Sequence, residues 1–355
     1  MFPAAHSFSQ TSVPPLDSLL SIEWISKGNK FSSKPLVHNG LVFETFNLQY
    51  ALRTENGERL YFSNHQHQSL IRTLTKDSVV VFSSDMGLSV LDIYSGSVIY
   101  ESFNRIKRPW TKVPGYWGDE NFYTALDDTT FIAFSLKSRR VIWKKKLPTV
   151  IFNLPIIRGD TIYLADKECL YVLDKHSGKE LQKYELGEII SNTHVIGDIL
   201  YAWIQGKGLI AMSISTGAVL WTFNDSKYKQ MYFELLFDRD IIYLYSKELY
   251  ALSRHTGRVI WSNQGLKSRE TYTLGLTKKY ILAFKKVDDR ATLVACRKTD
   301  GKIIYAEFQP KGEFLKFISP SLDSILRFGS RMHGNFIYAV DLNGNIYCLR
   351  VREDG

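Results

Sequence analysis

Few residues of this 355-residue chain have the types and spacing that chemistry at a protein site requires. His65 and His67, in the stretch NHQHQ, would share one face of a strand and could hold a metal ion together with a third ligand. The sequence offers no third ligand, so a polar connection between strands is the favoured interpretation. Asp127–Asp128 and Asp288–Asp289 are adjacent pairs in predicted turns, whereas acid–base catalysis needs carboxylates that converge from separate elements.

The other candidate histidines and the cysteines are predicted to be structural. His176 and His255 each stand two residues before the glycine of a turn, which favours solvated turn residues over metal ligands. Cys169, Cys296 and Cys348 fall in predicted strands, and an odd number of buried cysteines favours reduced thiols over a disulfide. Because the sequence shows neither a nucleophile beside a base nor a phosphate-binding glycine loop, it predicts no enzymatic activity, no metal and no cofactor.

The elements that carry these residues are hairpins. In ELYALSRHTGRVIW, residues 248–261, the first half alternates like a strand, a polar break follows, and Val259, Ile260 and Trp261 begin a second strand. Gly257 is the natural occupant of a turn position with positive φ, because a Cβ there costs about 1–2 kcal/mol. A single hairpin is barely stable in water, so such a unit needs neighbours to pack against.

The hairpin recurs along the chain, in most copies with a glycine in the turn and an aromatic residue four positions later. The turn position falls at residues 57, 96, 139, 178, 217, 257, 301 and 354. A step near forty residues corresponds to one four-stranded blade of a β-propeller. Upstream strand pairs, such as LPIIRGDTIYLAD, supply the two inner strands of a blade. Arg139 stands where other copies have glycine, so either that turn has another geometry or Arg139 is strained.

The two ends of the chain are predicted to complete one blade. The eighth hairpin lacks its outer strand, and SLLSIEW near the N-terminus supplies an unmatched strand that ends in Trp24. Pairing of this strand with the last blade closes the ring. The predicted fold is all-β, an eight-bladed β-propeller in a single domain of residues 1–355, with a flexible N-terminus (1–17), a closing strand (18–24) and blades over 34–354. Seven blades with an irregular insertion between 305 and 335 are the alternative.

These repeats resemble the pyrroloquinoline-quinone-like (PQQ-like) repeat family of eight-bladed propellers. HTGRVIW matches the end of a blade in that family, DLNGNIYCL at 341–349 matches its turn between middle strands, and the resemblance extends from Trp24 to Arg352. It implies the fold and little about function, because propellers carry function in their loops. Members of this size include the periplasmic propeller lipoprotein of the outer-membrane β-barrel assembly machine and ligand-sensing or scaffolding domains.

The quinoprotein enzymes of the same family carry adjacent cysteines, tryptophan-docking motifs between blades and calcium ligands above the cofactor. This sequence is expected to lack all three, so the resemblance implies no cofactor.

The chain is predicted to have no membrane span, because it contains no stretch of eighteen apolar residues. The N-terminal sequence MFPAAHSFSQTSVPPLDSLL has neither the basic start and apolar core of a signal peptide nor a lipoprotein cysteine. These features predict a cytoplasmic protein, or a periplasmic one if a signal peptide has been removed.

The surface is the remaining place for function. Connections from each outer strand to the next inner strand should share one face of the disc, which we call the loop face. They carry seventeen Lys and Arg residues against eight Asp and Glu residues, a difference equal to the formal net charge of +9. Their predicted ranges are 25–35, 62–69, 101–117, 144–150, 183–191, 222–231, 262–271 and 306–324. A basic face attracts an acidic partner, and a surface that only aids solubility is the alternative.

One long connection combines cations with aromatic residues, a mixture that protein interfaces favour. In SFNRIKRPWTKVPGYWGD the candidate partner-binding residues are Arg105, Lys107, Arg108, Trp110, Lys112, Tyr116 and Trp117. Such residues can also stack on single-stranded nucleic acid, but no nucleic-acid module accompanies them, so nucleic acid is not expected. The next candidate cluster lies on the opposite face and comprises Arg254, Arg258, Arg297, Lys298 and Lys302.

The sequence therefore favours a monomeric, non-catalytic scaffold that binds an acidic protein partner through its loop face, with a bacterial inhibitor or immunity protein as one instance. Two alternatives stay open. One is a periplasmic envelope-assembly or sensor propeller, and the other is a small-ligand binder or enzyme that uses the central channel.

Overall fold

The structure is a computed structural model, and every described element of regular structure is a β-strand, as the sequence predicts. The residues that it describes are 19–27, 36–43, 50–62, 69–74, 78–83, 87–92, 94–102, 116–118, 121–125, 129–135, 137–138, 140–151, 155–189, 193–224, 234–245, 248–266, 275–287, 290–306, 331–340 and 345–352.

The described strands form eight four-stranded antiparallel sheets, numbered here in chain order. Sheet 1 contains β2 (Leu36–His38), β3 (Leu41–Phe43), β4 (Tyr50–Arg53) and β5 (Arg59–Phe62). Sheet 2 contains β6 (Ser69–Leu74), β7 (Ser78–Ser83), β8 (Gly87–Asp92) and β9 (Val98–Ser102). Sheet 3 contains β10 (Tyr116–Gly118), β11 (Asn121–Ala125), β12 (Thr130–Ser135) and β13 (Arg140–Lys146). Sheet 4 contains β14 (Ile156–Arg158), β15 (Thr161–Ala165), β16 (Cys169–Asp174) and β17 (Glu180–Glu185).

The second half of the chain repeats this arrangement. Sheet 5 contains β18 (His194–Ile196), β19 (Ile199–Ile204), β20 (Gly208–Ser213) and β21 (Val219–Phe223). Sheet 6 contains β22 (Glu234–Asp238), β23 (Ile241–Tyr245), β24 (Leu249–Ser253) and β25 (Val259–Asn263). Sheet 7 contains β26 (Gly275–Leu276), β27 (Tyr280–Val287), β28 (Arg290–Arg297) and β29 (Ile303–Ala306). Sheet 8 contains β30 (Arg331–His333), β31 (Phe336–Val340), β32 (Ile346–Val351) and the N-terminal β1 (Leu20–Ser26).

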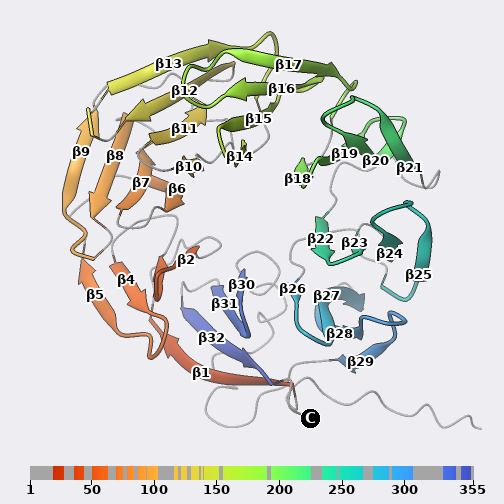
Figure 1. The fold of residues 1–355 in the computed structure, drawn as a ribbon. Helices are drawn as coiled ribbons and strands as arrows, with labels where there is room; N and C mark the ends of the chain where they lie inside the picture. The colour runs from red at the N-terminus through yellow and green to blue at the C-terminus, as the bar shows by residue number, and fades with distance from the viewer. Residues whose placement is uncertain are drawn as a thin grey trace, which may run out of the picture.

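The sheets are arranged around a central axis like the blades of a propeller (Figure 1). In sheets 1 to 7 the first strand lies nearest the axis and the fourth, the rim strand, lies outermost. In sheet 8 the rim strand is β1, because β1 pairs with β32: Leu20 lies opposite Val351 and Trp24 opposite Cys348. The rim strand of each sheet is therefore followed in the chain by the innermost strand of the next sheet.

The rim hairpins owe their shape to a small residue, a bulge and an aromatic residue. Ala133 lies opposite Trp143 and Ala211 opposite Trp221, which leaves room for the indole rings. One extra residue stands in the rim strand directly before the aromatic position, a β-bulge that bends the strand. In sheets 1 to 7 this bulged residue is always Leu or Ile: Leu60, Ile99, Ile142, Leu181, Leu220, Ile260 and Ile304.

The tryptophans of the rim strands reach into the next sheet. Trp143 Nε1 donates to the carbonyl oxygen of Lys175 at 3.0 Å, and Trp221 Nε1 donates to that of Arg254 at 3.0 Å. The same bond joins Trp24 to Thr54 (2.8 Å) and Trp261 to Lys298 (3.0 Å). The expectation that tryptophan docking between blades is absent was therefore wrong. It overlooked that the acceptor lies thirty or more residues further along the chain.

The turn glycines make this docking possible. Six of them have φ between 67° and 72°, which confirms the predicted positive φ: Gly57, Gly96, Gly178, Gly217, Gly257 and Gly301. A Cβ on Gly257 would lie 2.5 Å from Trp221, and a Cβ on Gly178 would lie 2.6 Å from Trp143. The same glycine thus serves the turn and the contact between sheets.

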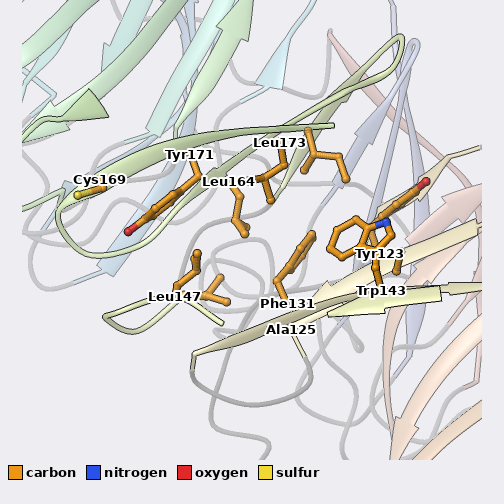
Figure 2. Packing of buried hydrophobic residues seen from close by; sticks show 12 residues of the cluster. Tyr123, Ala125, Phe131, Trp143, Leu147, Leu164, Cys169, Tyr171 and Leu173 are labelled. Carbon is orange, nitrogen blue, oxygen red and sulfur yellow. The ribbon is translucent and has the colours of Figure 1, made fainter. Parts of the chain in front are cut away.

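The hydrophobic core lies between neighbouring sheets rather than at one centre. Figure 2 shows the layer between sheets 3 and 4, whose buried members include Tyr123, Phe131, Trp143, Leu164, Tyr171 and Leu173. Similar clusters join sheets 4 and 5, 5 and 6, and 6 and 7. Each sheet therefore depends on its neighbours for burial of its apolar surface.

Backbone strain is found at a different arginine from the one that the repeat indicates. Arg139 lies outside the described residues, so the geometry of its turn stays a prediction. Arg239, in the turn between β22 and β23, has a φ of 48°. The corresponding turns of sheets 4 and 5 have Gly159 and Gly197 at this position.

Candidate partner-binding face

The predicted partner-binding connection is described only at its ends. Arg105, Lys107, Arg108, Trp110 and Lys112 lie outside the described residues. Tyr116 and Trp117 were assigned to the connection, but they belong to β10, where they pair with Tyr123 and Phe122. The connection therefore starts after Ser102 at the rim of sheet 2 and ends before Tyr116 at the inner edge of sheet 3.

Where the loop face is described, its connections are fixed to the turn between the two middle strands of the same sheet. The backbone N–H groups of Leu186 and Ile189 donate to the carbonyl oxygens of Glu168 and Lys167, at 3.0 and 2.7 Å. Leu186 and Ile189 are buried, as is Leu147 in the preceding sheet. Apolar residues of these connections thus fill the space between sheets and give the loop face a firm base.

A buried carboxylate supports the same turn. Asp166 is 1 % exposed and accepts hydrogen bonds from the backbone N–H groups of Glu168 and Cys169 and from the Tyr171 hydroxyl, at 2.9, 2.8 and 3.1 Å. Burial, together with the charge of Asp166, raises the pKa of Tyr171 above its usual value. Asp166 is therefore committed to holding the turn.

The lysines of the described loop face divide into paired and unpaired ones. The ion pairs are Lys145–Glu180 (2.8 Å), Lys167–Glu188 (3.1 Å) and Lys183–Glu185 (3.4 Å). Lys144 and Lys146 are exposed, and neither forms an ion pair with another described residue. The positive charge available to a partner is therefore concentrated beside β13 in this part of the face.

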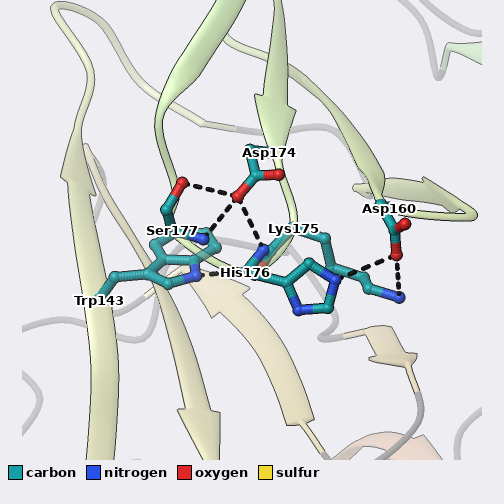
Figure 3. Close-up of polar contacts among 6 residues, drawn as sticks. All are labelled: Trp143, Asp160, Asp174, Lys175, His176 and Ser177. Carbon is teal, nitrogen blue, oxygen red and sulfur yellow. Dashed lines mark hydrogen bonds and ion pairs between the residues drawn. The ribbon is translucent and has the colours of Figure 1, made fainter.

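On the opposite face, charged pairs link the two short turns of a sheet. In sheet 4, Asp160 Oδ1 lies 3.0 Å from His176 Nε2 and 3.4 Å from Lys175 Nζ (Figure 3). Hydrogen bonds from these two side chains lower the pKa of Asp160. His255 makes the same contact with Asp240 at 2.9 Å in sheet 6. Both histidines are exposed turn residues, as predicted.

The alternative basic cluster on this opposite face is largely neutralised. Three of its five cations form ion pairs: Arg254–Asp240 (3.7 Å), Lys298–Asp238 (2.7 Å) and Arg297–Asp300 (3.0 Å). Only Arg258 and Lys302 remain exposed without a described ion pair. This cluster therefore offers an acidic partner less free charge than its sequence suggests.

The predicted chemistry-bearing residues are only partly described. His65, His67, Asp127–Asp128 and Asp288–Asp289 lie outside the described residues. Within the described ranges, no group of three His, Cys, Asp or Glu residues could hold a metal ion.

One histidine that the sequence did not single out is chemically distinctive. His194 in β18 is partly buried against Phe237 of sheet 6, with 5.1 Å between the ring centroids, and burial lowers its pKa to about 4. It is a neutral imidazole packed into the structure.

The three cysteines are buried and free, which confirms the prediction of reduced thiols. Burial raises the pKa of Cys348 to about 12 and also raises that of Cys169.

Across the ranges that the structure describes, no helix has the length and hydrophobicity needed to cross a bilayer.

Known proteins share this architecture. A family model described as outer membrane protein assembly factor BamB matches residues 101–304. The crystal structure of BamB from Moraxella catarrhalis matches with a TM-score of 0.71 at 14 % identity, over 95 % of this chain and 99 % of that one. The computationally designed Ika8 protein matches with a TM-score of 0.69 at 13 % identity, over 93 % of this chain and 99 % of that one. No curated protein sequence matches.

At these identities the two solved structures establish a shared fold, whereas the family model matches the sequence itself over more than half of the chain. The resemblance to PQQ-like repeats is thereby confirmed, and the β-propeller with it. The chain belongs to the PQQ-like repeat family described as outer membrane protein assembly factor BamB.

Proposed function

We propose that this protein is a non-catalytic, protein-binding propeller that acts in assembly of the bacterial envelope, in the periplasm. The observation that carries the proposal is the BamB family match over residues 101–304, joined to a fold likeness that covers 99 % of a BamB chain. It replaces the cytoplasmic location that the N-terminal sequence favoured. The inhibitor or immunity role has no support from the family match, which favours the periplasmic alternative.

The scaffold proposed is one domain of eight blades in a closed ring. Supporting it are the eight described four-stranded sheets and the β1–β32 pairing, which joins strands from the two ends of the chain. The docking of Trp24 on sheet 1 continues the contact from the last sheet to the first. A closed ring holds its connections in fixed relative positions, as a binding surface requires.

The proposed binding site is the connection between sheets 2 and 3 together with the start of β10. Its residues are Arg105, Lys107, Arg108, Trp110 and Lys112 in the connection, and Tyr116 and Trp117 in β10. The connection joins β9, which lies at the rim, to β10, which lies near the axis. An aromatic anchor surrounded by cations suits a protein surface that carries carboxylates, so the proposed partner is acidic and meets a monomeric propeller.

The test measures binding of the full chain to the purified β-barrel assembly machinery of the same bacterium. Trp110→Ala should weaken binding by at least about 2 kcal/mol, mainly through faster dissociation, as loss of an interface anchor does. Lys107→Glu with Arg108→Glu should mostly slow association, and the effect should shrink as salt rises.

The matched aromatic control is Tyr94→Ala, because Tyr94 is 54 % exposed in a turn on the opposite face. This variant should bind like the unaltered protein. Equal affinity of all the variants would remove the proposed site, and the absence of any binding would remove the proposed function.

A further inference from the structure

The rim strand β13 differs in charge from the other described rim strands. Arg140, Lys144 and Lys146 are exposed along it, and Lys137 is exposed in the turn before it. None of the four forms an ion pair with a described residue. The corresponding strand of sheet 6 has exposed Ser262 in place of Lys144, and its continuation has Gln264 in place of Lys146.

β13 is also an unpaired edge. It pairs with β12 on one side and with no described strand on the other, and it lies at the outside of the ring (Figure 1). The N–H and C=O groups along such an edge are a template for another polypeptide backbone. The bulge at Ile142 interrupts the ladder, so regular pairing is open to residues 143–146.

The side chains beside this edge have the period of an extended peptide. Lys144 and Lys146 are two residues apart on a strand, which separates them by about 6.6 Å. Acidic residues at alternate positions of an extended peptide have the same separation, so each carboxylate can face one ammonium group. Ile142 lies next to them and is 45 % exposed, so it can contact an apolar residue of the peptide that stands between or after the acidic ones.

A polypeptide fits these features better than a lipid surface or a nucleic acid does. All three could meet the lysines, but only a polypeptide has a backbone that can satisfy the N–H and C=O groups of the edge.

We propose that the outer edge of β13 is a docking site for an extended acidic segment of a protein partner, paired beside residues 143–146 and held by Lys144 and Lys146. This surface goes beyond the proposed function, because it is distinct from residues 103–115 and its test uses neither that connection nor the assembly machinery.

The test uses a fluorescein-labelled peptide with the sequence Gly-Ser-Glu-Val-Glu-Val-Glu-Ser-Gly and fluorescence anisotropy with the full chain. Lys144→Glu with Lys146→Glu should weaken binding by about tenfold or more, and Lys144→Gln with Lys146→Gln by a smaller factor. The matched control is Arg258→Glu with Lys302→Glu, which reverses two exposed, unpaired cations at the hairpins of sheets 6 and 7. The control should bind like the unaltered chain, and all variants should melt at the same temperature because the altered side chains are exposed.

A second peptide separates strand pairing from attraction between charges. Methylation of its alternate backbone nitrogens keeps the carboxylates and removes N–H donors, so binding should fall by about tenfold. Equal binding of the methylated peptide would overturn the proposal, as would no binding of the first peptide or an equal loss of binding in the control variant.

Phosphatidylglycerol vesicles and a thymidine oligonucleotide are the remaining probes. If either binds through Lys144 and Lys146 more tightly than the peptide does, the site serves that macromolecule and the proposal is wrong.

Discussion

The turn glycines combine two constraints that can be separated by experiment. Gly257 has a φ of 68° and faces Trp221 of the preceding sheet, whereas Gly159 has a φ of 53° and a Cβ added to it would meet nothing within 4 Å. Gly159→Ala should therefore cost only the backbone term of about 1–2 kcal/mol. Gly257→Ala should cost about 3 kcal/mol or more, because the tryptophan must also move. Urea unfolding measures both, and equal losses would show that docking does not constrain the turn.

Arg239 offers the opposite substitution. It holds a φ of 48° where related turns have glycine, and its side chain is exposed. Arg239→Gly should relieve this strain. Glycine also makes the unfolded chain more flexible, which offsets part of the gain, so the net stabilisation should be about 1 kcal/mol. The pKa of Asp240 is lowered mainly by the hydrogen bond from His255, and the charge of Arg239 adds a minor part that the substitution removes. A net loss in thermal unfolding would mean that contacts of the arginine outweigh its strain.

His194 should make stability depend on pH. Its pKa is about 4 in the folded protein, below the usual value of 6.5, so the folded state binds fewer protons than the unfolded chain. The stabilisation is complete above about pH 6.5 and is lost as the pH falls toward 4, by about 3 kcal/mol. The carboxylates with lowered pKa values add to the acid loss, so His194→Leu is the reference. Parallel curves of unfolding free energy against pH for the two proteins would contradict this account.

Local features of single residues were predicted from the sequence, whereas contacts between sheets were not. The positive φ of Gly257 was predictable from its turn, because the constraint is local. The docking of Trp221 on Arg254 was not predicted, although a signal was present: a rim tryptophan is repeatedly followed by a turn glycine some 33 to 40 residues later, as Trp143 is by Gly178. The ion pair between Lys145 and Glu180 joins sheet 3 to sheet 4, and no comparable pattern in the sequence predicts it.

Among the elements, the seven-residue strand β1 should contribute strongly to the stability of the fold. Leu20 and Trp24 are buried, and Trp24 docks against Gly57 and Thr54 of sheet 1. Deletion of residues 1–25 removes both and exposes the edge of β32, so it should lower stability by about 5 kcal/mol or more, or cause aggregation. Deletion of residues 1–17 is the control and should leave the melting temperature unchanged. An unchanged melt of the longer deletion would contradict the role of β1 in closing the ring.

The strands were more predictable than the connections for a physical reason. Alternating apolar residues and turn glycines recur about every forty residues. One copy that departs from the pattern, such as the one with Gln182 at the aromatic position, can therefore still be recognised from the other copies. Connections do not repeat, and their lengths are not fixed by the sheets. The expected connection 101–117 therefore included Glu101 and Ser102 from β9 and Tyr116 and Trp117 from β10.

At the scale of the whole molecule, the net charge of +9 is not spread evenly. Ion pairs neutralise most of the cluster on the opposite face, whereas Lys144 and Lys146, at the rim of sheet 3, form no ion pair with any residue that the structure describes. The net charge of the whole chain was readable from the sequence. Its division between the two faces depends on ion pairs formed in the fold, such as Lys298–Asp238, which joins residues sixty positions apart. The family match directs attention to envelope assembly, and the proposed closed ring would present a partner with connections in fixed positions.

Binding to the envelope-assembly machinery can be detected by site-specific photocrosslinking in living cells, with p-benzoylphenylalanine in place of Trp110. We expect a crosslink to a component of the outer-membrane assembly machinery, formed in the periplasm. The same photoreactive residue in place of Tyr94, on the opposite face, should give no such crosslink. A crosslink from position 110 to a cytoplasmic toxin, or none to any envelope-assembly component, would contradict the account.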